Sequence, residues 1–239
     1  MLRVNNLSKY FGNLCALDAV SFEVKEGEIF GIAGPNGSGK TTLFNVISGA
    51  LAPSAGEVFF NGSNITGMKP HEVCHRGLAR TFQIPVVFSS MTVRDNIKIG
   101  ACFGSRGRED EEKNINEVIS FVGLQGKENT ITKNLDLFGK KSVMIGAALA
   151  TRPRLLLLDE PIAGLTPVEV EKSVDLFHKI NSDLGITIII IEHLMKVFVK
   201  ICGRCMILDY GERIYLGSAK EIHKDKAVCE SYLGDGYNA

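Results

Sequence analysis

Three largely apolar runs stand out along this chain. They cover residues 29–33, 155–158 and 185–191, and none of them alternates between apolar and polar positions. Strands that are apolar at nearly every position are buried on both faces, as in a parallel sheet covered by helices. Apolar residues recur with helical spacing at 42–48 and 167–181, which predicts helices to cover that sheet. We therefore expect an α/β fold with a parallel central sheet flanked by helices.

The first third of the chain has a different pattern, typical of half-buried strands. Residues 2–10 and 20–24 alternate between apolar and polar positions, and a strand is expected at 57–60. That strand ends at Asn61-Gly62, a pair that favours a tight hairpin turn. The mixed sheet should therefore include an antiparallel N-terminal β region.

The character of the chain changes after Gln83, where apolar residues take up helical spacing. We predict a helical subdomain over residues 84–149, joined to a core made of 1–83 and 150–239. All 239 residues would then form a single domain. The further elements expected are helices at 70–76, 92–101 and 109–122, a strand at 78–83, a hairpin at 206–216 and a final helix at 219–233.

The segment after the first apolar run has the phosphate-loop pattern G-x-x-x-x-G-K-[ST]. Glycines allow successive backbone N–H groups to point at phosphate oxygens, and the following helix adds the positive end of its dipole. Lys40 supplies a positive charge for the β- and γ-phosphates, and the Thr41 hydroxyl can ligate Mg²⁺. The residues expected to bind the nucleotide are Gly34, Pro35, Asn36, Gly37, Ser38, Gly39, Lys40, Thr41 and Thr42.

Acidic, amide and imidazole side chains follow other predicted strands, where an α/β sheet binds its ligands. Asp159 is expected on the metal side of a magnesium nucleotide, and Glu160 can polarise a water in line with the γ-phosphate. His193 can hydrogen-bond the γ-phosphate or that water, and Gln83 can reach the metal or the water. Taken singly, Glu160 could instead be a helix cap and His193 a core histidine.

Composition and charge bear on which partners the protein binds, and they say little about its fold. The chain has 27 basic and 27 acidic residues, so zero net charge gives no electrostatic reason to expect nucleic acid or anionic lipid. No apolar run reaches transmembrane length, and the N-terminus lacks a signal-peptide pattern. We expect the protein in the cytosol, where ATP is.

With these motifs in this order, the chain resembles the ATP-binding subunits of ABC transporters over essentially its whole length. Residues 34–41 resemble the Walker A motif, Gln83 the Q-loop, residues 155–160 Walker B with its catalytic glutamate, and His193 the switch histidine. The segments that are similar to importers of the branched-chain amino acid, amide and urea type are Ala79-Arg80-Thr81-Phe82-Gln83, Met91-Thr92-Val93, Asp159-Glu160-Pro161-Ile162-Ala163-Gly164-Leu165 and Tyr232-Leu233-Gly234.

The resemblance implies an ATPase that uses Mg²⁺ and energises the uptake of a small solute, such as a branched-chain amino acid or a related amide. Phe11 falls where the family stacks an aromatic ring on adenine, and Tyr10 is the alternative. The implied partners are transmembrane permease subunits, a second ABC ATPase subunit and, indirectly, a solute-binding protein, with no nucleic acid. The implied place is the cytoplasmic, inner face of the cell membrane.

One motif of the resembling family is altered. Its Leu-Ser-Gly-Gly-Gln signature should fall at 135–139, where this chain has Leu135-Asp136-Leu137-Phe138-Gly139. A shift by one residue would still leave Asp136 in the segment. An ionised aspartate cannot donate a hydrogen bond to a phosphate and repels it, although it is a good helix N-cap. We expect a working Walker side and a weak signature side; the alternatives are that the motif tolerates drift or that this copy is decaying.

Three other functions fit the same motifs less well. An ABC ATPase of DNA repair would carry a long coiled coil, and a translation type would carry two cassettes. A nucleotide-binding regulator with impaired hydrolysis is suggested by the altered signature. A phosphate-loop kinase would give no reason for Gln83 and His193 at these places.

Overall fold

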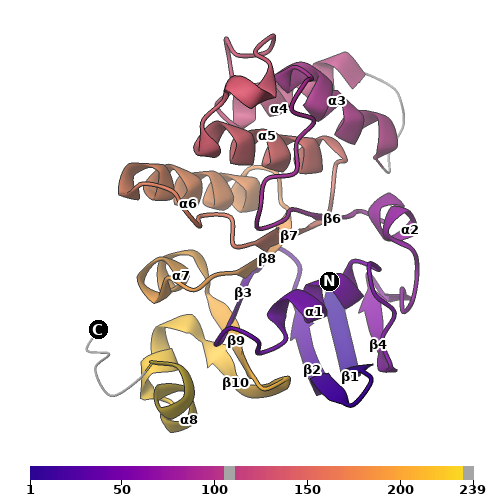
Figure 1. The fold of residues 1–239 in the computed structure, drawn as a ribbon, viewed down its shortest axis with the longest axis vertical. Helices are drawn as coiled ribbons and strands as arrows, with labels where there is room; N and C mark the ends of the chain where they lie inside the picture. Colours follow the sequence, from indigo (N-terminus) through magenta and orange to yellow (C-terminus); the bar gives the residue numbers. More distant parts are fainter. Residues whose placement is uncertain (105–110, 234–239) are drawn as a thin grey trace. The chain divides into compact units, whose positions relative to one another are not determined.

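The computed structural model describes residues 1–104 and 111–233 and has an α/β architecture (Figure 1). Contacts divide the chain into two compact units. The first consists of residues 1–70 and the chain from Thr187 onwards, and the second is 71–186. The predicted boundaries after residues 83 and 149 both fall inside the second unit, and the division into core and helical subdomain stays a prediction.

The antiparallel sheet of the first unit confirms the expected N-terminal β region. Its strand order is β2-β1-β4-β5, and Leu2 of β1 lies opposite Val24 on one side and Phe60 on the other. Asn61 and Gly62 both have positive φ, which is the geometry of a tight hairpin turn. The strands are β1 (Leu2–Phe11), β2 (Leu14–Val24), β4 (Ala55–Phe60) and β5 (Ser63–Asn64).

The parallel strands of the first unit are apolar because both of their faces are covered. β3 lies between β8 and β9 and runs parallel to both, and β10 closes a hairpin antiparallel to β9. Every residue of β3 and β8 is buried. A side-chain carbon added at Gly31 would lie 2.3 Å from the Phe198 ring, so a short helix that the sequence did not predict, α7, packs closely on β3. The elements are β3 (Ile29–Ala33), α1 (Lys40–Ile47), β8 (Thr187–Ile191), α7 (Met195–Ile201), β9 (Arg204–Asp209) and β10 (Glu212–Ser218).

The predicted final helix over 219–233 is wrong as a single element. Asp225 has an extended backbone, with φ −82° and ψ 122°, and its carboxylate accepts a hydrogen bond from the Val228 N–H at 3.1 Å. A residue that caps a new helical turn interrupts the one before it. The segment is therefore the 3₁₀ helix η2 (Ala219–Lys224), the short α8 (Lys226–Val228) and the π-helical turn η3 (Cys229–Leu233). Gly234 of the resembling segment lies outside the described residues.

The second unit contains a parallel pair of strands, β6 (Leu78–Arg80) and β7 (Leu155–Asp159). β6 was expected to continue to Gln83 but ends at Arg80. The Thr81 N–H, one residue beyond this end, still donates to the Leu157 carbonyl of β7 at 2.9 Å. All of β7 is buried, as its unbroken apolar run predicts. The helices beside this pair are α2 (Pro70–His75) and α6 (Pro167–Ser182).

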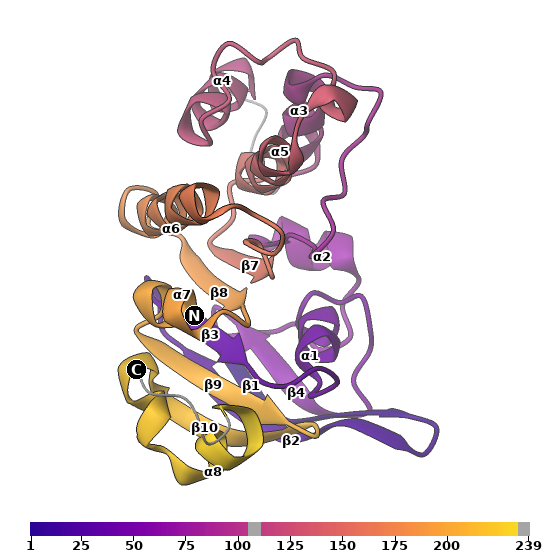
Figure 2. The same cartoon turned by 60° about the vertical axis from the view of Figure 1, so that its left-hand side comes forward.

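The rest of the second unit is mostly helical, as expected (Figure 2). α3, α4 and α5 contact one another. A side-chain carbon at Gly100 of α3 would lie 1.9 Å from the Ala147 carbonyl of α5, so glycine permits their close approach. Residues 105–110, within the predicted subdomain, lie outside the described part. The elements are α3 (Val93–Phe103), α4 (Glu111–Phe121), η1 (Thr132–Asn134) and α5 (Leu137–Ala150).

Within residues 1–104 and 111–233, no helix combines the length and the apolar character that crossing a bilayer requires.

Candidate nucleotide-binding site

The phosphate loop joins β3 to α1 and needs glycine at two of its positions for steric reasons. Gly34 has φ +147°, and a side-chain carbon there would lie 2.0 Å from the Leu208 carbonyl oxygen. Gly39 has φ +102°, and the same substitution would meet the Ala16 carbonyl oxygen at 2.4 Å. Both are left-handed or related conformations that other residues rarely adopt. The loop is therefore fixed in shape by neighbouring strands.

Lys40 lies folded back across this loop. Its side chain is buried, and Nζ donates to the Gly34 carbonyl at 2.9 Å and to the Pro35 carbonyl at 2.7 Å. The Ser38 hydroxyl lies 3.4 Å from the same nitrogen. The positive charge is thus held at the loop, where the phosphate-loop pattern requires it.

The start of α1 suits an anion. Its N-cap is Gly39, which provides no side-chain cap, and the first turn contains no acidic residue. The first N–H groups of a helix have no partner within the helix, and the helix dipole makes this end positive. Thr41 is exposed and Thr42 is half-buried in the same turn. A triphosphate therefore fits the backbone, the lysine and the helix start of this segment.

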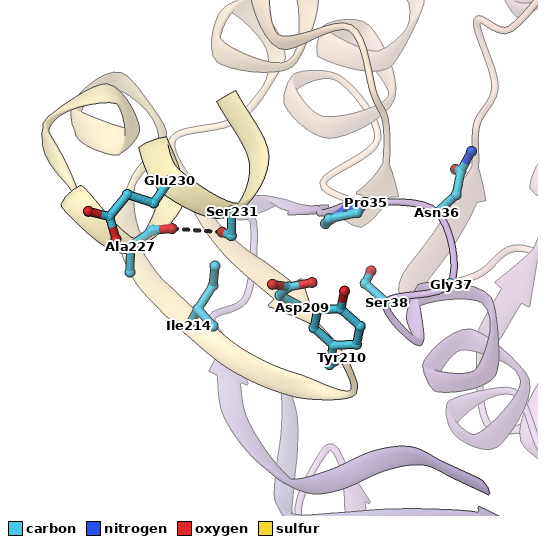
Figure 3. Close-up of a pocket in the computed structure, with 10 residues that line it drawn as sticks. All are labelled: Pro35, Asn36, Gly37, Ser38, Asp209, Tyr210, Ile214, Ala227, Glu230 and Ser231. Atoms are coloured by element: carbon cyan, nitrogen blue, oxygen red, sulfur yellow. Dashed lines mark hydrogen bonds between the residues drawn. The ribbon is translucent and has the colours of Figure 1, made fainter. Parts of the chain in front are cut away.

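A pocket of about 690 Å³ is lined on one side by residues 35–38 of the loop (Figure 3). Its walls come from the loop, from the β9–β10 hairpin and from the C-terminal helical segment, and Figure 3 shows Tyr210 and Ser38 together at one side of it. No sequence motif predicts that the hairpin and the C-terminal segment reach the loop, because only folding brings them there. The lining residues are Pro35, Asn36, Gly37, Ser38, Asp209, Tyr210, Ile214, Ala227, Glu230 and Ser231.

The aromatic residues expected at adenine lie at the end of β1. Phe11 is 46% exposed and Tyr10 is 45% exposed, so the structure leaves both rings accessible. Lys9 Nζ lies 5.2 Å from the centre of the Phe11 ring and donates to the Ala52 carbonyl at 2.8 Å. The neighbouring Cys15 thiol raises the pKa of Tyr10.

Asp159, the expected metal-side carboxylate, ends β7 and is buried. Its Oδ2 accepts from Arg80 Nη2 at 3.0 Å. Sequence reasoning missed this partner: Arg80 belonged to a segment quoted only for its resemblance, and its contact joins residues far apart in the chain. An ionised carboxylate has room for several donors on its two oxygens, so an ion pair and a metal can use it together.

Glu160 and Gln83 are brought together in the second unit. Gln83 Nε2 donates to Glu160 Oε2 at 2.6 Å. Glu160 has φ +46°, an uncommon conformation for a residue with a side chain. Lys141, a buried cation of α5, donates to the carbonyls of Glu160 and Pro161 at 3.2 and 2.8 Å. Glu160 does not cap a helix, because the next helix, α6, begins at Pro167 with Thr166 as its cap.

His193 lies just after β8 and is half-buried. Its backbone N–H donates to the Glu192 carboxylate at 3.3 Å, and Glu192 itself is buried. The imidazole is thus neither fully enclosed nor fully exposed, which leaves room for the expected role.

The altered signature segment opens α5. Asp136 is the N-cap, as predicted, and its Oδ1 accepts from the Gly139 N–H at 2.7 Å. Phe138 is half-buried in the first turn. The carboxylate therefore occupies the helix start at which the resembling family places a serine.

The oxygen donors near these motifs suit magnesium. Hydroxyl, amide and carboxylate oxygens are hard ligands, and Mg²⁺ is usually held by one or two carboxylates together with phosphates and water. Over the two described stretches, no three His, Cys, Asp or Glu side chains gather as a metal-holding group. The residues expected to supply such oxygens are Thr41 in the first unit and Gln83 and Asp159 in the second.

Comparison with known proteins gives a consistent result. The ABC transporter family model matches residues 17–163. The probable branched-chain amino acid transport ATP-binding protein LivG of Archaeoglobus fulgidus is 34% identical, with 98% of this chain and 95% of that protein covered. The methionine import ATP-binding protein MetN of Clostridioides difficile is 35% identical, with 93% of this chain and 70% of that protein covered.

The solved structures agree with the sequence matches. A crystal structure of the ADP conformation of an ATP-binding cassette of an ABC transporter superposes with a TM-score of 0.88 and 34% identity. The match covers 98% of this chain and 99% of the other. The family match, the similar proteins and this shared fold establish that the chain belongs to the ABC transporter family.

Proposed function

We propose that this chain is the ATP-binding and ATP-hydrolysing subunit of an ABC importer. The single observation that supports this most is the phosphate loop, in which buried Lys40 spans the loop before an uncapped α1. The likeness to LivG favours a branched-chain amino acid or a related amide as the solute, and the likeness to MetN makes methionine the competing solute.

Each candidate residue has a defined part in this proposal. The phosphate loop from Gly34 to Thr42 binds the phosphates, and the Phe11 ring stacks on adenine, with Tyr10 as the alternative. Thr41, Gln83 and Asp159 would hold Mg²⁺, which neutralises charge on the β- and γ-phosphates when it is bound. The full set is supported by motif order and by the local geometry of each unit.

The water-activating role falls to Glu160. Its carboxylate is held by Gln83, and its backbone carbonyl is held by Lys141. A glutamate held at both its carboxylate and its backbone can accept a proton from a water in line with the γ-phosphate. His193 would then hydrogen-bond that water or the phosphate.

The partners in this proposal are transmembrane permease subunits and a second ABC ATPase subunit, with a solute-binding protein acting through the permease. The chain would lie on the cytoplasmic face of the membrane. Mg·ATP would join two such ATPase subunits, and hydrolysis would separate them, so that the helical subdomain over residues 84–149, joined to the core at Gln83, passes the motion to the permease.

The experiment is solute uptake into vesicles that contain the permease, both ATPase subunits and the solute-binding protein. We expect ATP-dependent uptake of labelled leucine, and none when this chain carries Glu160→Gln. Uptake of methionine instead of leucine would reassign the solute. Uptake that persists at the wild-type rate with Glu160→Gln would contradict the catalytic role of this chain.

A second function is a nucleotide-binding subunit with impaired hydrolysis, and Asp136 favours it. Its carboxylate caps α5 where a neutral hydrogen-bond donor is expected. The steady-state ATPase rate of the assembled complex, with and without solute-loaded binding protein, distinguishes the two. A solute-stimulated rate supports the importer ATPase, and a rate at background supports the impaired subunit.

A further inference from the structure

Asp159 shares an ion pair that is almost shut off from water. Arg80 Nη2 lies 3.0 Å from Asp159 Oδ2, and the two side chains are only 7% and 6% exposed. Charges in such a setting are screened weakly by solvent, so each strongly affects the other and any further ion nearby. The pair lies wholly within the second unit, at the carboxyl ends of β6 and β7.

Arg80 is held so that its charge stays beside the carboxylate. Its backbone lies opposite Leu157 in the parallel pairing of β6 with β7. Its guanidinium also lies over the Phe82 ring, 5.1 Å from the ring centre, which is a favourable cation–π distance. The guanidinium therefore contacts both a carboxylate and an aromatic ring, and these contacts restrict its movement.

Under the proposed function, on which this inference rests, Asp159 also serves Mg²⁺. Two cations then compensate one carboxylate. Arg80 stabilises the ionised carboxylate when no metal is bound, and it repels a metal ion that approaches the same group. We propose that Arg80 acts through Asp159 as a resident counter-ion, which weakens Mg²⁺ binding and so assists the release of Mg·ADP after hydrolysis.

The first unit provides a control arginine in a chemically similar but more exposed pair, whose side chains are 34% and 13% exposed. Arg204 Nη1 pairs with Glu28 Oε1 at 2.8 Å, and its guanidinium lies over the Phe30 ring at 5.5 Å. A guanidinium, a carboxylate and a phenyl ring thus meet here as they do at Arg80, but no sequence motif predicts a metal at this carboxylate. Replacing either arginine with methionine removes one charge and leaves most of the side-chain volume.

The test measures how strongly a fluorescent ATP analogue binds the full chain at pH 8, first in EDTA and then across a range of Mg²⁺ concentrations. In Arg80→Met, the Mg²⁺ concentration that gives half of the full change in analogue affinity should be about tenfold lower than in the wild type. A charge this close to a carboxylate shifts an ionic equilibrium of that carboxylate by about this factor. Binding in EDTA should change little, and Arg204→Met should keep the wild-type Mg²⁺ requirement.

Thermal unfolding gives a second reading that does not depend on the analogue. Without metal, both methionine variants should unfold at a lower temperature than the wild type, because each leaves a carboxylate without its arginine. Mg·ADP should then restore more of the loss in Arg80→Met than in Arg204→Met. If Arg80→Met does not fold, Arg80→Gln takes its place, and Arg80→Lys, which keeps the charge, should retain the wild-type Mg²⁺ requirement.

An unchanged or higher Mg²⁺ requirement in Arg80→Met or Arg80→Gln would overturn the counter-ion role. A wild-type chain whose nucleotide affinity does not depend on Mg²⁺ at all would overturn the proposed function, and the counter-ion role with it.

Discussion

The starts of α1 and α5 satisfy their unpaired N–H groups in opposite ways. At α1 the N-cap is Gly39, with no side-chain cap and no acid in the first turn. At α5 the N-cap is Asp136, whose carboxylate accepts from the Gly139 N–H at 2.7 Å. Both helix starts carry the positive end of a dipole, but α1 leaves it without a side-chain cap and α5 neutralises it with its own side chain.

The difference shows that one helix start can be built for binding and another for stability. Glycine at an N-cap contributes conformational freedom, and aspartate at an N-cap contributes a hydrogen bond and a favourable charge. The same charge repels a phosphate. We therefore expect the phosphate loop of this chain to bind its own nucleotide well. Its signature segment, residues 135–139, should bind the partner subunit's nucleotide poorly.

Gly39→Ala, just before α1, should destabilise the chain more than any substitution at the start of α5. The new side-chain carbon would lie 2.4 Å from the Ala16 carbonyl oxygen at φ +102°. Strain of this kind together with the clash should lower the free energy of unfolding by about 3 kcal/mol. Gly62→Ala is the control, because Gly62 also has positive φ but nothing within 4 Å. Urea unfolding measures both, and equal losses would mean that the loop is not fixed by its neighbours.

Next comes the loss of the loop's cation in Lys40→Met. A charge-assisted hydrogen bond contributes about 1.5–3 kcal/mol, so affinity for ATP should fall roughly tenfold to a hundredfold. Lys25→Met changes an exposed lysine of the same unit and should bind as the wild type does. Isothermal titration calorimetry measures the affinities. Wild-type affinity in Lys40→Met would remove α1 and its loop from nucleotide binding.

At α5 the comparison predicts a smaller loss of stability. Asp136→Ala removes the cap and should lower the free energy of unfolding by about 1 kcal/mol. Asp136→Asn keeps an acceptor for the Gly139 N–H and should lie close to the wild type. Urea unfolding of the two variants separates the cap from the charge. A loss of the same size in both would show that the charge, rather than the hydrogen bond, stabilises the helix start.

The smallest effect is expected from Asp136→Ser in the assembled complex. Serine still caps the helix and removes the negative charge, so stability should hardly change. If this charge weakens one of two composite sites, the steady-state ATPase rate should rise, and at most double. A lower rate in this variant would show that the aspartate assists turnover and that the two helix starts are not opposed in function.

Local motifs are the part of this site that the sequence predicts well. The phosphate loop is one continuous segment whose glycines, lysine and flanking elements are all recorded in order, and the structure has each of these elements where expected. The Asp136 cap was predicted for the same reason, since an N-cap depends on residues a turn apart. Unbroken apolar runs likewise predicted the buried β7 and β8.

Contacts between distant residues are the part that it does not predict. The Arg80–Asp159 pair and the Lys141 contacts to the Glu160 and Pro161 carbonyls depend on tertiary packing. No periodicity or motif records which buried charge meets which partner. The broken C-terminal helix was missed because Asp225 can continue a helix or cap a new one, and only its backbone conformation distinguishes the two.

We expect ATP to be hydrolysed at the site built on this chain's phosphate loop and hardly at all at the site closed by its signature segment. The most direct test is the steady-state ATPase rate of the assembled complex, with Glu160→Gln in this chain or the matching substitution in the partner ATPase subunit. Loss of a general base should slow the first complex by about 10²–10⁴-fold, and the second should keep most of its rate. Equal losses in the two complexes would contradict the claim.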